Sequence, residues 1–415
     1  MISIPKGTKD ILPKEVYKWQ ALEELIREIC GNYGFSEIRT PIFEHSELFE
    51  RGIGDGSDIV QKEMYSFEIA GRRLSLKPEG TAGVVRSFIE NKLYADPLPA
   101  KYYYITPCFR YERMQKGRQR QFYQFGVEIF GSEDMLADAE VIAIGYDLLT
   151  RLGLKGFKLH INSIGCPKCR EVYRKKLMDY LRPHYDQLSE AGKLRFETNP
   201  MRIFDSKDPA EKAIVKDAPR MTEYLCEECT ISFSDLQAKL AALEIPFELD
   251  RDIVRGLDYY TKTAFEFISK DLGAQSTVCG GGRYDHLIEQ LGGPDIPGVG
   301  FGLGMERLLL IAEAQGVNFP DKHSVDVFIA AIGEEAESEA LKLGKRLRKA
   351  GFSVTTDCIR RGLKAQLRHA DRIDASYSVL IGQDEIDKGV FTLRDMSNST
   401  QIEVAPEDLE LYLKR

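Results

Sequence analysis

Two short segments in the second half of the chain carry residue types that suit a polar pocket better than a hydrophobic core. The first, Arg255 to Phe267, reads Arg-Gly-Leu-Asp-Tyr-Tyr-Thr-Lys-Thr-Ala-Phe-Glu-Phe, so an arginine and two adjacent tyrosines enter a strand-like run. The second, Gly280 to Asp285, reads Gly-Gly-Gly-Arg-Tyr-Asp, and its glycines predict a tight turn. Charged and aromatic side chains in both segments predict that they form the wall of a binding site.

A floor for this pocket is predicted by two strand-like runs, Tyr102 to Glu112 and Gln121 to Phe130, which flank a basic loop. Alternate residues of a strand point to the same face of its sheet. One face therefore carries polar side chains around a glycine, namely Arg110, Glu112, Gln124, Gly126 and Glu128. The opposite face is apolar. We expect one face of this sheet to be core and the other to hold a polar ligand.

The bulk composition is that of an ordinary globular protein with more than one domain. A chain of 415 residues exceeds what one hydrophobic core usually holds, so two or three domains are expected. The net charge of −8 argues against indiscriminate binding of nucleic acid. Local basic patches at residues 110–120 and 342–372 still allow RNA binding. The sequence shows no signal-peptide pattern and no membrane-spanning run, so we expect a cytoplasmic protein and no membrane partner.

Patterning along the chain predicts where the elements lie. Residues 14–33 have the spacing of an amphipathic helix, and residues 166 to about 245 read as a helical insertion between two groups of strands. After Phe319-Pro320 the pattern changes to strand, helix, strand, helix, strand at residues 325–332, 334–350, 352–356, 363–373 and 377–381. That order predicts a small, mostly parallel α/β domain. We expect domains at residues 1–322 and 323–415.

Three ordered segments resemble the motifs of class II aminoacyl-tRNA synthetases: Gly34 to Phe43, Phe109 to Glu128, and Gly300 to Arg307. The two segments described first resemble the signatures of the histidyl-tRNA synthetase family, and Arg361 to Asp371 resembles its anticodon-binding domain. The resemblance implies an α+β protein with an antiparallel-sheet catalytic domain, a helical insertion and a C-terminal α/β anticodon-binding domain. It also implies a homodimer whose interface includes the first segment, and the substrates ATP, L-histidine and tRNA-His.

The same resemblance assigns the nucleotide site. Joining a carboxylate to the α-phosphate of ATP requires cations that are fixed where charge accumulates, and arginine meets phosphate oxygens with two donors. The positions that match the family's ATP-binding residues are Arg110, Glu112, Arg118, Arg120 and Arg307. Of these, Arg110 and Arg307 are expected to be catalytic together with Arg255. Mg²⁺ is the expected cofactor.

The family's histidine-binding residues match Glu79, Gly80, Thr81, Arg110, Gln124, Glu128, Arg255, Tyr259, Tyr260 and Tyr284. Glu79 is expected to meet the α-ammonium group, and Glu128 and one tyrosine are expected to meet the two imidazole nitrogens. Tyr259 and Tyr260 are adjacent, so one of them could instead face the core. Arg113 and Gln115, in the basic loop, match residues that read the acceptor end of tRNA.

The cysteines raise a separate question. Cys166 and Cys169 form one Cys-x-x-Cys pair, and Cys226 and Cys229 form another. Two such pairs are typical of a tetrahedral zinc site, although the gap between them is long. The alternative is that all four are reduced thiols packed in the protein interior. The pattern leaves both interpretations open.

Two other functions compete with the one that the resemblance implies. A histidine-binding regulatory subunit of ATP phosphoribosyltransferase is a non-catalytic relative, but it typically lacks the Arg-Gly-Leu-Asp-Tyr-Tyr segment and the C-terminal domain. A class II synthetase for a different amino acid would leave Arg255 to Phe267 unexplained. Histidine-dependent exchange of pyrophosphate into ATP separates the ligase from the sensor.

Overall fold

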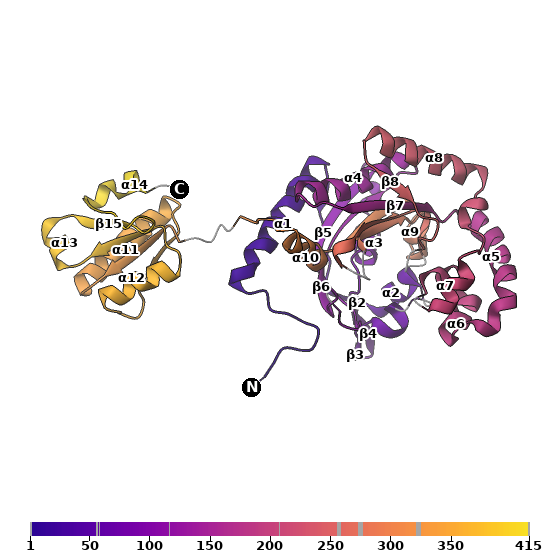
Figure 1. Ribbon diagram of the computed structural model, residues 1–415, viewed down its shortest axis with the longest axis horizontal. Helices are drawn as coiled ribbons and strands as arrows, with labels where there is room; N and C mark the ends of the chain where they lie inside the picture. The colour runs from indigo at the N-terminus through magenta and orange to yellow at the C-terminus, as the bar shows by residue number, and fades with distance from the viewer. Residues whose placement is uncertain are drawn as a thin grey trace. The chain divides into compact units, whose positions relative to one another are not determined.

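The computed structural model describes residues 2–54, 57, 59–115, 117–206, 208–254, 259–272, 277–320 and 325–413. The chain divides into two compact units, Met1–Asn318 and Phe319–Arg415, each with its own sheet (Figure 1). The predicted domain boundary, between residues 322 and 323, lies outside the described residues. Within the described ranges, no helix combines the length and the apolar character needed to cross a membrane.

An eight-stranded sheet forms the centre of the first unit, in the order β1-β5-β6-β11-β10-β9-β7-β8. All neighbouring strands from β5 to β7 are antiparallel, and only the edge strands β1 and β8 run parallel to their partners. The strands are β1 (Ser36–Glu37), β5 (Ala100–Phe109), β6 (Gln121–Phe130), β7 (Phe157–Ser163), β8 (Phe247–Leu249), β9 (Thr261–Ser269), β10 (Thr277–Arg283) and β11 (Gly298–Gly304). The antiparallel catalytic sheet that was expected is therefore present.

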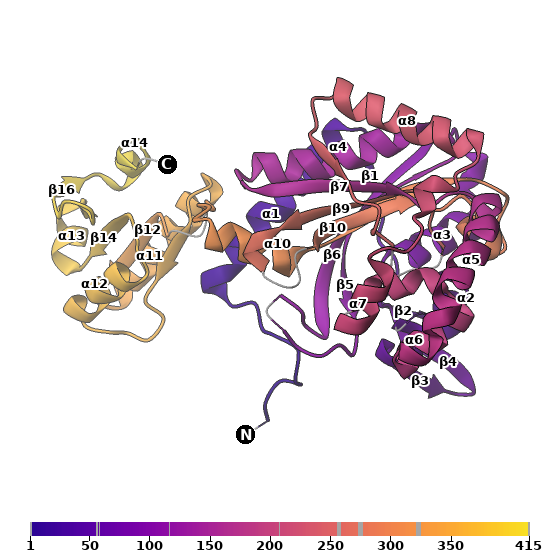
Figure 2. The same ribbon diagram turned by 45° about the vertical axis from the view of Figure 1, so that its right-hand side comes forward.

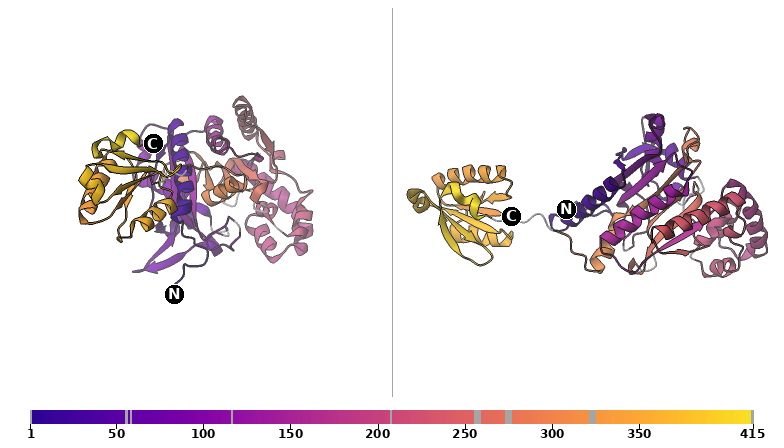
Figure 3. Two further views of the ribbon diagram at one scale, coloured as in Figure 1. Left: turned by 60° about the vertical axis from the view of Figure 1, so that its left-hand side comes forward. Right: turned by 90° about the horizontal axis from the view of Figure 1, so that it is seen from above.

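Helices cover this sheet. On one face α4 packs on β6, β10 and β11 and contacts α1 and α8, and α4 and α8 run side by side (Figures 2 and 3). On the other face α3 and α9 pack against aromatic residues of the sheet, including Tyr104 and Phe130. The helices are α1 (Pro13–Asn32), α2 (Ser46–Ile53), α3 (Thr81–Glu90), α4 (Met135–Arg151), α8 (Glu227–Ala242), α9 (Leu287–Gln290) and α10 (Met305–Ala314). A three-stranded sheet stands apart, with β2 (Phe43–His45), β4 (Arg72–Leu76) and β3 (Ser66–Ile69) in that order.

The insertion is helical, as predicted. Between β7 and β8 the chain forms α5 (Pro167–Leu181), α6 (Glu190–Thr198), α7 (Pro209–Val215) and α8. These helices and their connections bury a hydrophobic cluster of their own, which includes Tyr173, Leu177 and Ile203. The predicted amphipathic helix at residues 14–33 is also confirmed, because α1 buries Leu22 and Ile26.

Two local predictions were wrong. The first strand of the polar floor ends at Phe109, before Arg110, because the backbone N–H of Tyr111 turns away to the carbonyl of Glu63 at 2.7 Å. The run Gly280-Gly281-Gly282 is not a turn but part of β10, between β9 and β11. A Cβ atom at Gly281 would lie 2.2 Å from the carbonyl oxygen of Gly300, so glycine is needed here for close packing rather than for chain reversal.

The second unit contains a five-stranded sheet in the order β13-β12-β14-β15-β16. Its elements are β12 (Val327–Ala331), α11 (Glu334–Lys349), β13 (Val354–Thr356), α12 (Leu363–Arg372), β14 (Tyr377–Ile381), α13 (Gln383–Lys388), β15 (Phe391–Asp395), β16 (Gln401–Val404) and α14 (Leu409–Tyr412). The three predicted strands are parallel to one another. The sheet is mixed rather than mostly parallel, because β15 and β16 add an antiparallel pair that the sequence analysis missed.

Both faces of that sheet are covered by helices. Val327 and Ile329 of β12 pack in a cluster with α11 and α14, while Phe328 and Ala330 pack with Ala370 of α12. Alternate residues of one buried strand therefore serve two cores, which explains why β12 is apolar throughout.

Candidate functional site

A cavity of about 200 Å³ lies over the middle of the eight-stranded sheet. Its walls come from the loop after β5, from the strands β6, β10 and β11, from the start of α3 and of α10, and from the tyrosine pair before β9. The lining residues are Glu79, Thr81, Arg110, Glu112, Gly117, Arg118, Gln119, Phe122, Gln124, Tyr259, Tyr260, Thr277, Val278, Gly280, Gly302, Gly304, Glu306 and Arg307. Nine of them are residues that the sequence analysis assigned to substrates, brought together from distant parts of the chain.

The floor of the cavity is polar because β11 carries glycine at alternate positions. Gly300 and Gly302 pair with Glu128 and Gly126 of β6, so no β11 side chain covers this part of the sheet. A Cβ atom at Gly300 would lie 1.9 Å from Oε2 of Glu128, and one at Gly302 would lie 2.4 Å from Nε2 of Gln124. The glycines thus leave space that the polar side chains of β6 occupy. The predicted division of β6 into a polar and an apolar face is confirmed.

Three arginines of the lining lie near Glu112 and form the arginine end of the cavity. One of them, Arg110, also donates through Nε to the carbonyl oxygen of Pro78 at 2.8 Å, next to Glu79. The Arg118 guanidinium pairs with the Glu112 carboxylate at 2.7 Å, and Arg110 lies 3.8 Å from the same carboxylate. Arg307, at the start of α10, donates to the carbonyl oxygens of Thr277 and Gly117 at 2.6 and 3.3 Å. Burial lowers the pKa of Arg307, and the charges of Arg118 and Arg110 lower it further. The three guanidinium groups outnumber the carboxyls of the lining near them, Glu112 and Glu306, so this part of the cavity favours an anion.

At the other end, Glu79 and Gln124 are held by backbone amides. The Glu79 carboxylate accepts the N–H groups of Thr81 and Ala82 at 2.7 and 2.8 Å, at the N-terminus of α3. Gln124 accepts the N–H of Gly80 at 2.8 Å, which fixes its amide over the floor. Burial raises the pKa of Glu79, while the two amide hydrogen bonds act against that rise. Glu79 is therefore an oriented acceptor, suited to a cationic group.

Glu128 lies behind Thr81 and is fully buried. Its carboxylate accepts hydrogen bonds from the hydroxyls of Thr81 at 2.7 Å and Tyr104 at 3.1 Å, and a further one from Tyr284. Burial raises the pKa of Glu128 from its usual 4.5 to about 8, although the hydroxyls oppose the rise. No cation approaches this carboxyl among the contacts of the described residues. A buried carboxyl with a raised pKa beside a cavity is a candidate binding group.

Tyr259 and Tyr260 both line the cavity, and both are also buried in the hydrophobic cluster that contains Tyr104 and Tyr284, so the two roles do not exclude each other. They precede β9, where the backbone is not a regular strand and the rule of alternating faces does not hold. Their rings are tilted, with centroids 4.6 Å apart, and Tyr284 stands edge-on to Tyr259 at 5.5 Å. The three rings form an aromatic wall beside Glu128.

Some assigned residues lie elsewhere. Arg120 is absent from the described lining, and its guanidinium stacks 3.7 Å from the ring centroid of Tyr111. Arg283, in the second signature, is fully buried and pairs with Asp138 of α4, so it anchors β10 rather than a ligand. Arg113 and Gln115 are exposed on the loop after β5. Arg255 lies outside the described residues.

Among the residues of the site that the sequence analysis did not assign to a substrate, Tyr104 and Glu306 have the clearest contacts. Tyr104 lies between Gly80 and Gly126, whose added Cβ atoms would lie 2.2 and 2.3 Å from its ring, and it donates to Glu128. Glu306 lines the cavity, accepts the N–H of Tyr123 with both oxygens at 2.9 and 3.1 Å, and has a pKa that burial raises to about 7. Glu306 directly precedes Arg307 in the sequence, and this position could have identified it as a residue of the site. Nothing in the pattern of β5 distinguished Tyr104 from its tyrosine neighbours.

The comparison with known protein families agrees with this geometry. A family model described as "Histidyl-tRNA synthetase" matches residues 7–169 and 206–308, and one described as "Anticodon binding domain" matches residues 326–415. The first match contains every described residue that lines the cavity. The second matches the five-stranded unit.

Relatives match along the whole chain. A histidine–tRNA ligase from Acetivibrio thermocellus is 52% identical over 411 residues, with 99% of each chain covered. Another from Clostridioides difficile is 53% identical over 413 residues, covering 99% of this chain and 98% of that one. The crystal structure of apo S. aureus histidyl-tRNA synthetase superposes with a TM-score of 0.86 at 38% identity and covers 100% of both chains. The chain therefore belongs to the histidyl-tRNA synthetase family of class II aminoacyl-tRNA synthetases.

Proposed function

We propose that the chain is a histidine–tRNA ligase, which activates L-histidine with ATP to histidyl-adenylate and transfers it to the 3′ end of tRNA-His. The observation that carries this is a single cavity with three arginines at one end and oriented carboxyl, amide and tyrosine groups at the other. The relatives that match nearly the full length are named histidine–tRNA ligases.

The arginine end is the proposed site of the ATP phosphates. Adenylation makes a bond between the histidine carboxylate and the α-phosphate and breaks the bond to pyrophosphate, so negative charge accumulates on phosphate oxygens. Arg110, which lies between Glu112 and the carbonyl oxygen of Pro78, is assigned to the α-phosphate, and Arg118 to the outer phosphates. Arg307 is assigned to the adenine face and a phosphate, and Glu112 to the adenine amino group. Arg120 would have to leave Tyr111 to take part.

The acceptor end is the proposed site of histidine. Glu79, with both oxygens fixed by amides, is assigned to the α-ammonium group, together with Gly80, Thr81 and Gln124. Glu128 and a tyrosine of the pair Tyr259/Tyr260 are assigned to the two imidazole nitrogens. To reach the ring, Glu128 must exchange one of its hydroxyl donors for the ligand, with Tyr284 and Tyr104 keeping it in place. A site of this kind rejects amino acids that leave a buried polar group unpaired.

Mg²⁺ is the cofactor we propose. It prefers oxygen ligands and usually joins protein carboxylates to substrate phosphates. Glu306 fits this role: it lines the cavity beside Arg307, and its described hydrogen bond is to a backbone N–H, which leaves oxygen lone pairs free for a cation. The ion would supply charge neutralisation at the phosphates. The histidine-binding residues need no metal for their roles.

Contacts with tRNA are assigned to two regions. Arg113 and Gln115 are exposed on the loop that borders the cavity, where an acceptor end could reach the adenylate. The five-stranded unit, which matches an anticodon-binding domain, carries a basic stretch from Lys342 to Arg372. Most protein contacts to nucleic acid go to phosphate and need such basic side chains. Because the substrate is tRNA in protein synthesis, we expect the enzyme to act in the cytoplasm.

A homodimer is proposed as the working form. Four large apolar side chains are exposed in and near the three-stranded sheet: Ile42 (46% exposed), Phe43 (55%), Phe67 (38%) and Ile69 (60%). A group of exposed apolar side chains on neighbouring strands is typical of a protein interface. The first two belong to the segment that builds the dimer interface in the family.

The test is exchange of labelled pyrophosphate into ATP, which reports formation of the adenylate. The ligase should catalyse exchange only with histidine present. A histidine-binding sensor would bind histidine and give no exchange, and a synthetase for another amino acid would exchange with that amino acid instead. Charging of tRNA-His then tests the second step.

A further inference from the structure

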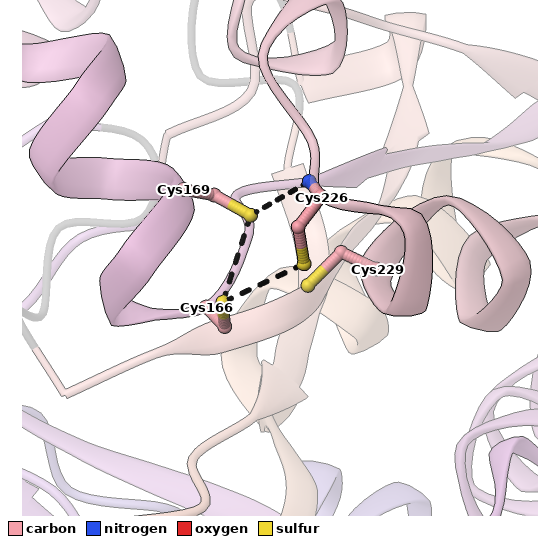
Figure 4. Close-up of side chains that lie close together, drawn as sticks. All are labelled: Cys166, Cys169, Cys226 and Cys229. Atoms are coloured by element: carbon pink, nitrogen blue, oxygen red, sulfur yellow. Dashed lines mark hydrogen bonds between the residues drawn. The ribbon is translucent and has the colours of Figure 1, made fainter.

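We propose that one structural zinc ion is bound by four cysteines: Cys166, Cys169, Cys226 and Cys229. Their four sulfur atoms all lie within 4.8 Å of one another, with Cys166 3.6 Å from Cys169 and 3.9 Å from Cys226 (Figure 4). Zinc bound tetrahedrally at about 2.3 Å from each sulfur would place the sulfurs about 3.8 Å apart. The space between the four sulfur atoms, called the cage below, therefore has the size of a single ion. A cubane iron–sulfur cluster would need the four sulfurs farther apart.

The backbone around the cage favours thiolates, the form in which cysteine binds zinc. Cys166 is the N-cap of α5 and Cys226 is the N-cap of α8, with Cys169 and Cys229 in the first turns. Two helix N-termini thus point their partial positive charge at the sulfurs. The backbone N–H of Cys226 also donates to the sulfur of Cys169 at 3.1 Å. Reduced thiols packed only as apolar groups would need neither feature.

The position of the cage gives the ion a structural purpose. Cys169 and Cys229 are buried in the hydrophobic cluster of the insertion, and they join its first helix to its last. A module as small as this insertion buries little apolar surface and gains from a covalent or metal cross-link. All four cysteines are free thiols, and none is paired in a disulfide. In the described part of the chain, the other candidate group for a metal is His286, Glu289 and Asp295, of which the two carboxylates are exposed.

The cage also borders the aromatic wall of the cavity, called the tyrosine wall below, which Tyr259, Tyr260 and Tyr284 form. Arg170, which follows Cys169, donates to the carbonyl oxygen of Tyr260. Lys262, two residues beyond Tyr260, donates its N–H to the carbonyl of Gly165 at 3.0 Å and pairs with Glu228 at 3.1 Å. Residues next to three of the four cysteines thus hold the segment around Tyr260. The ion should fix this wall, an inference that rests on the proposed role of Tyr259 and Tyr260 in histidine binding.

The first experiment measures metal in the full-length protein, purified without added metal or chelator, by elemental analysis. We expect about one zinc per chain, released by a thiol-blocking organomercurial. Replacement by Co²⁺ should give the charge-transfer and d–d bands of tetrahedral thiolate coordination. The variants Cys166→Ser and Cys229→Ser should fall below about 0.2 zinc per chain. Cys358→Ser, at an exposed cysteine of the second unit, should keep the full content.

The wild-type measurement does not depend on any variant being folded. Folded wild-type protein that holds no zinc and takes up none from an equimolar solution would overturn the proposal, as would iron in place of zinc. Full zinc content in both serine variants would also overturn it.

The second experiment measures histidine and ATP binding by calorimetry before and after removal of the zinc. We expect histidine binding to weaken by about 3- to 10-fold, with ATP binding changed by less than about twofold. Bound zinc with unchanged histidine affinity would refute the link to the tyrosine wall. Protein that holds zinc but never binds histidine would refute the proposed function and leave the metal site standing.

Discussion

The substitution Glu128→Gln should stabilise the unliganded fold at alkaline pH while it weakens histidine binding. Burial raises the pKa of Glu128 from 4.5 to about 8, so the folded protein holds this proton more tightly than the unfolded chain does. The stability linked to the proton is fully present below about pH 4.5 and is lost as the pH rises to about 8. Between about pH 6 and about pH 8.5, wild type should therefore lose roughly 2 kcal/mol that the glutamine variant keeps.

Binding should change in the opposite direction. The glutamine keeps the shape of Glu128 and its contact with the three hydroxyls, but above about pH 8, where Glu128 is ionised, it removes the charge that an imidazole N–H would meet in a desolvated pocket. We expect histidine affinity to fall by about 2–3 kcal/mol and ATP affinity to stay nearly the same, since the described contacts of Glu128 are with hydroxyl groups and not with the arginines.

Denaturation of both proteins at the two pH values, and calorimetry with each substrate, measure these effects. Glu133→Gln, at an exposed carboxyl just beyond the end of β6, is the matched control and should change neither quantity. If the stability difference between wild type and Glu128→Gln does not grow with pH, the surroundings already stabilise the charge of the buried carboxylate and its pKa is not raised. Equal losses of histidine and ATP affinity would mean that Glu128 is structural.

Three further predictions follow from the proposed roles. Arg255→Ala should lower the rate of pyrophosphate exchange by a factor of about 10²–10³, with little change in histidine affinity. Arg255→Lys should recover little of that rate, because an ammonium group cannot bridge the histidine carboxylate and the α-phosphate. Near-normal exchange in a folded Arg255→Ala enzyme would contradict the assignment. Phe43→Glu should shift the protein toward monomer in analytical ultracentrifugation, whereas Leu341→Glu, at an exposed leucine of the second unit, should not. Deletion of residues 323–415 should reduce aminoacylation of tRNA far more than adenylate formation, and equal loss of both in a well-folded truncation would argue against the division of roles.

Much of the fold could be predicted because its signals are local. The period of two in Gln121–Phe130 gave β6 with the correct bounds and faces, and the helical spacing of residues 14–33 gave α1 within one residue. The alternation of apolar and helical runs after Phe319 gave three strands and two helices of the second unit. In its last hairpin, β16 was missed because Gln401, Ile402 and Glu403 are exposed, whereas β15 has alternating buried residues, Phe391 and Leu393, that could have predicted a strand.

Predictions about the site failed where geometry depends on distant parts of the chain. The Gly280-Gly281-Gly282 run has the composition of a turn, and only its two neighbouring strands show why glycine is needed in β10. The segment that contains Arg283 was predicted to form the wall of a binding site, but this arginine pairs with Asp138, which is far away in the sequence. The spacing of the cysteines could not say whether the two pairs meet, since that depends on how α5 and α8 pack.

The alternate glycines of β11 also limit how this enzyme could be altered to accept other amino acids. Any side chain placed at Gly300 or Gly302 would overlap Glu128 or Gln124, so single substitutions in the floor should abolish the site rather than reshape it. Thr81, Tyr259 and Tyr260 have side chains that border the cavity directly, so substitutions there should change its shape without filling the floor. A directed-evolution library for histidine analogues should therefore vary these wall positions and leave the floor untouched, and selected variants should retain both glycines.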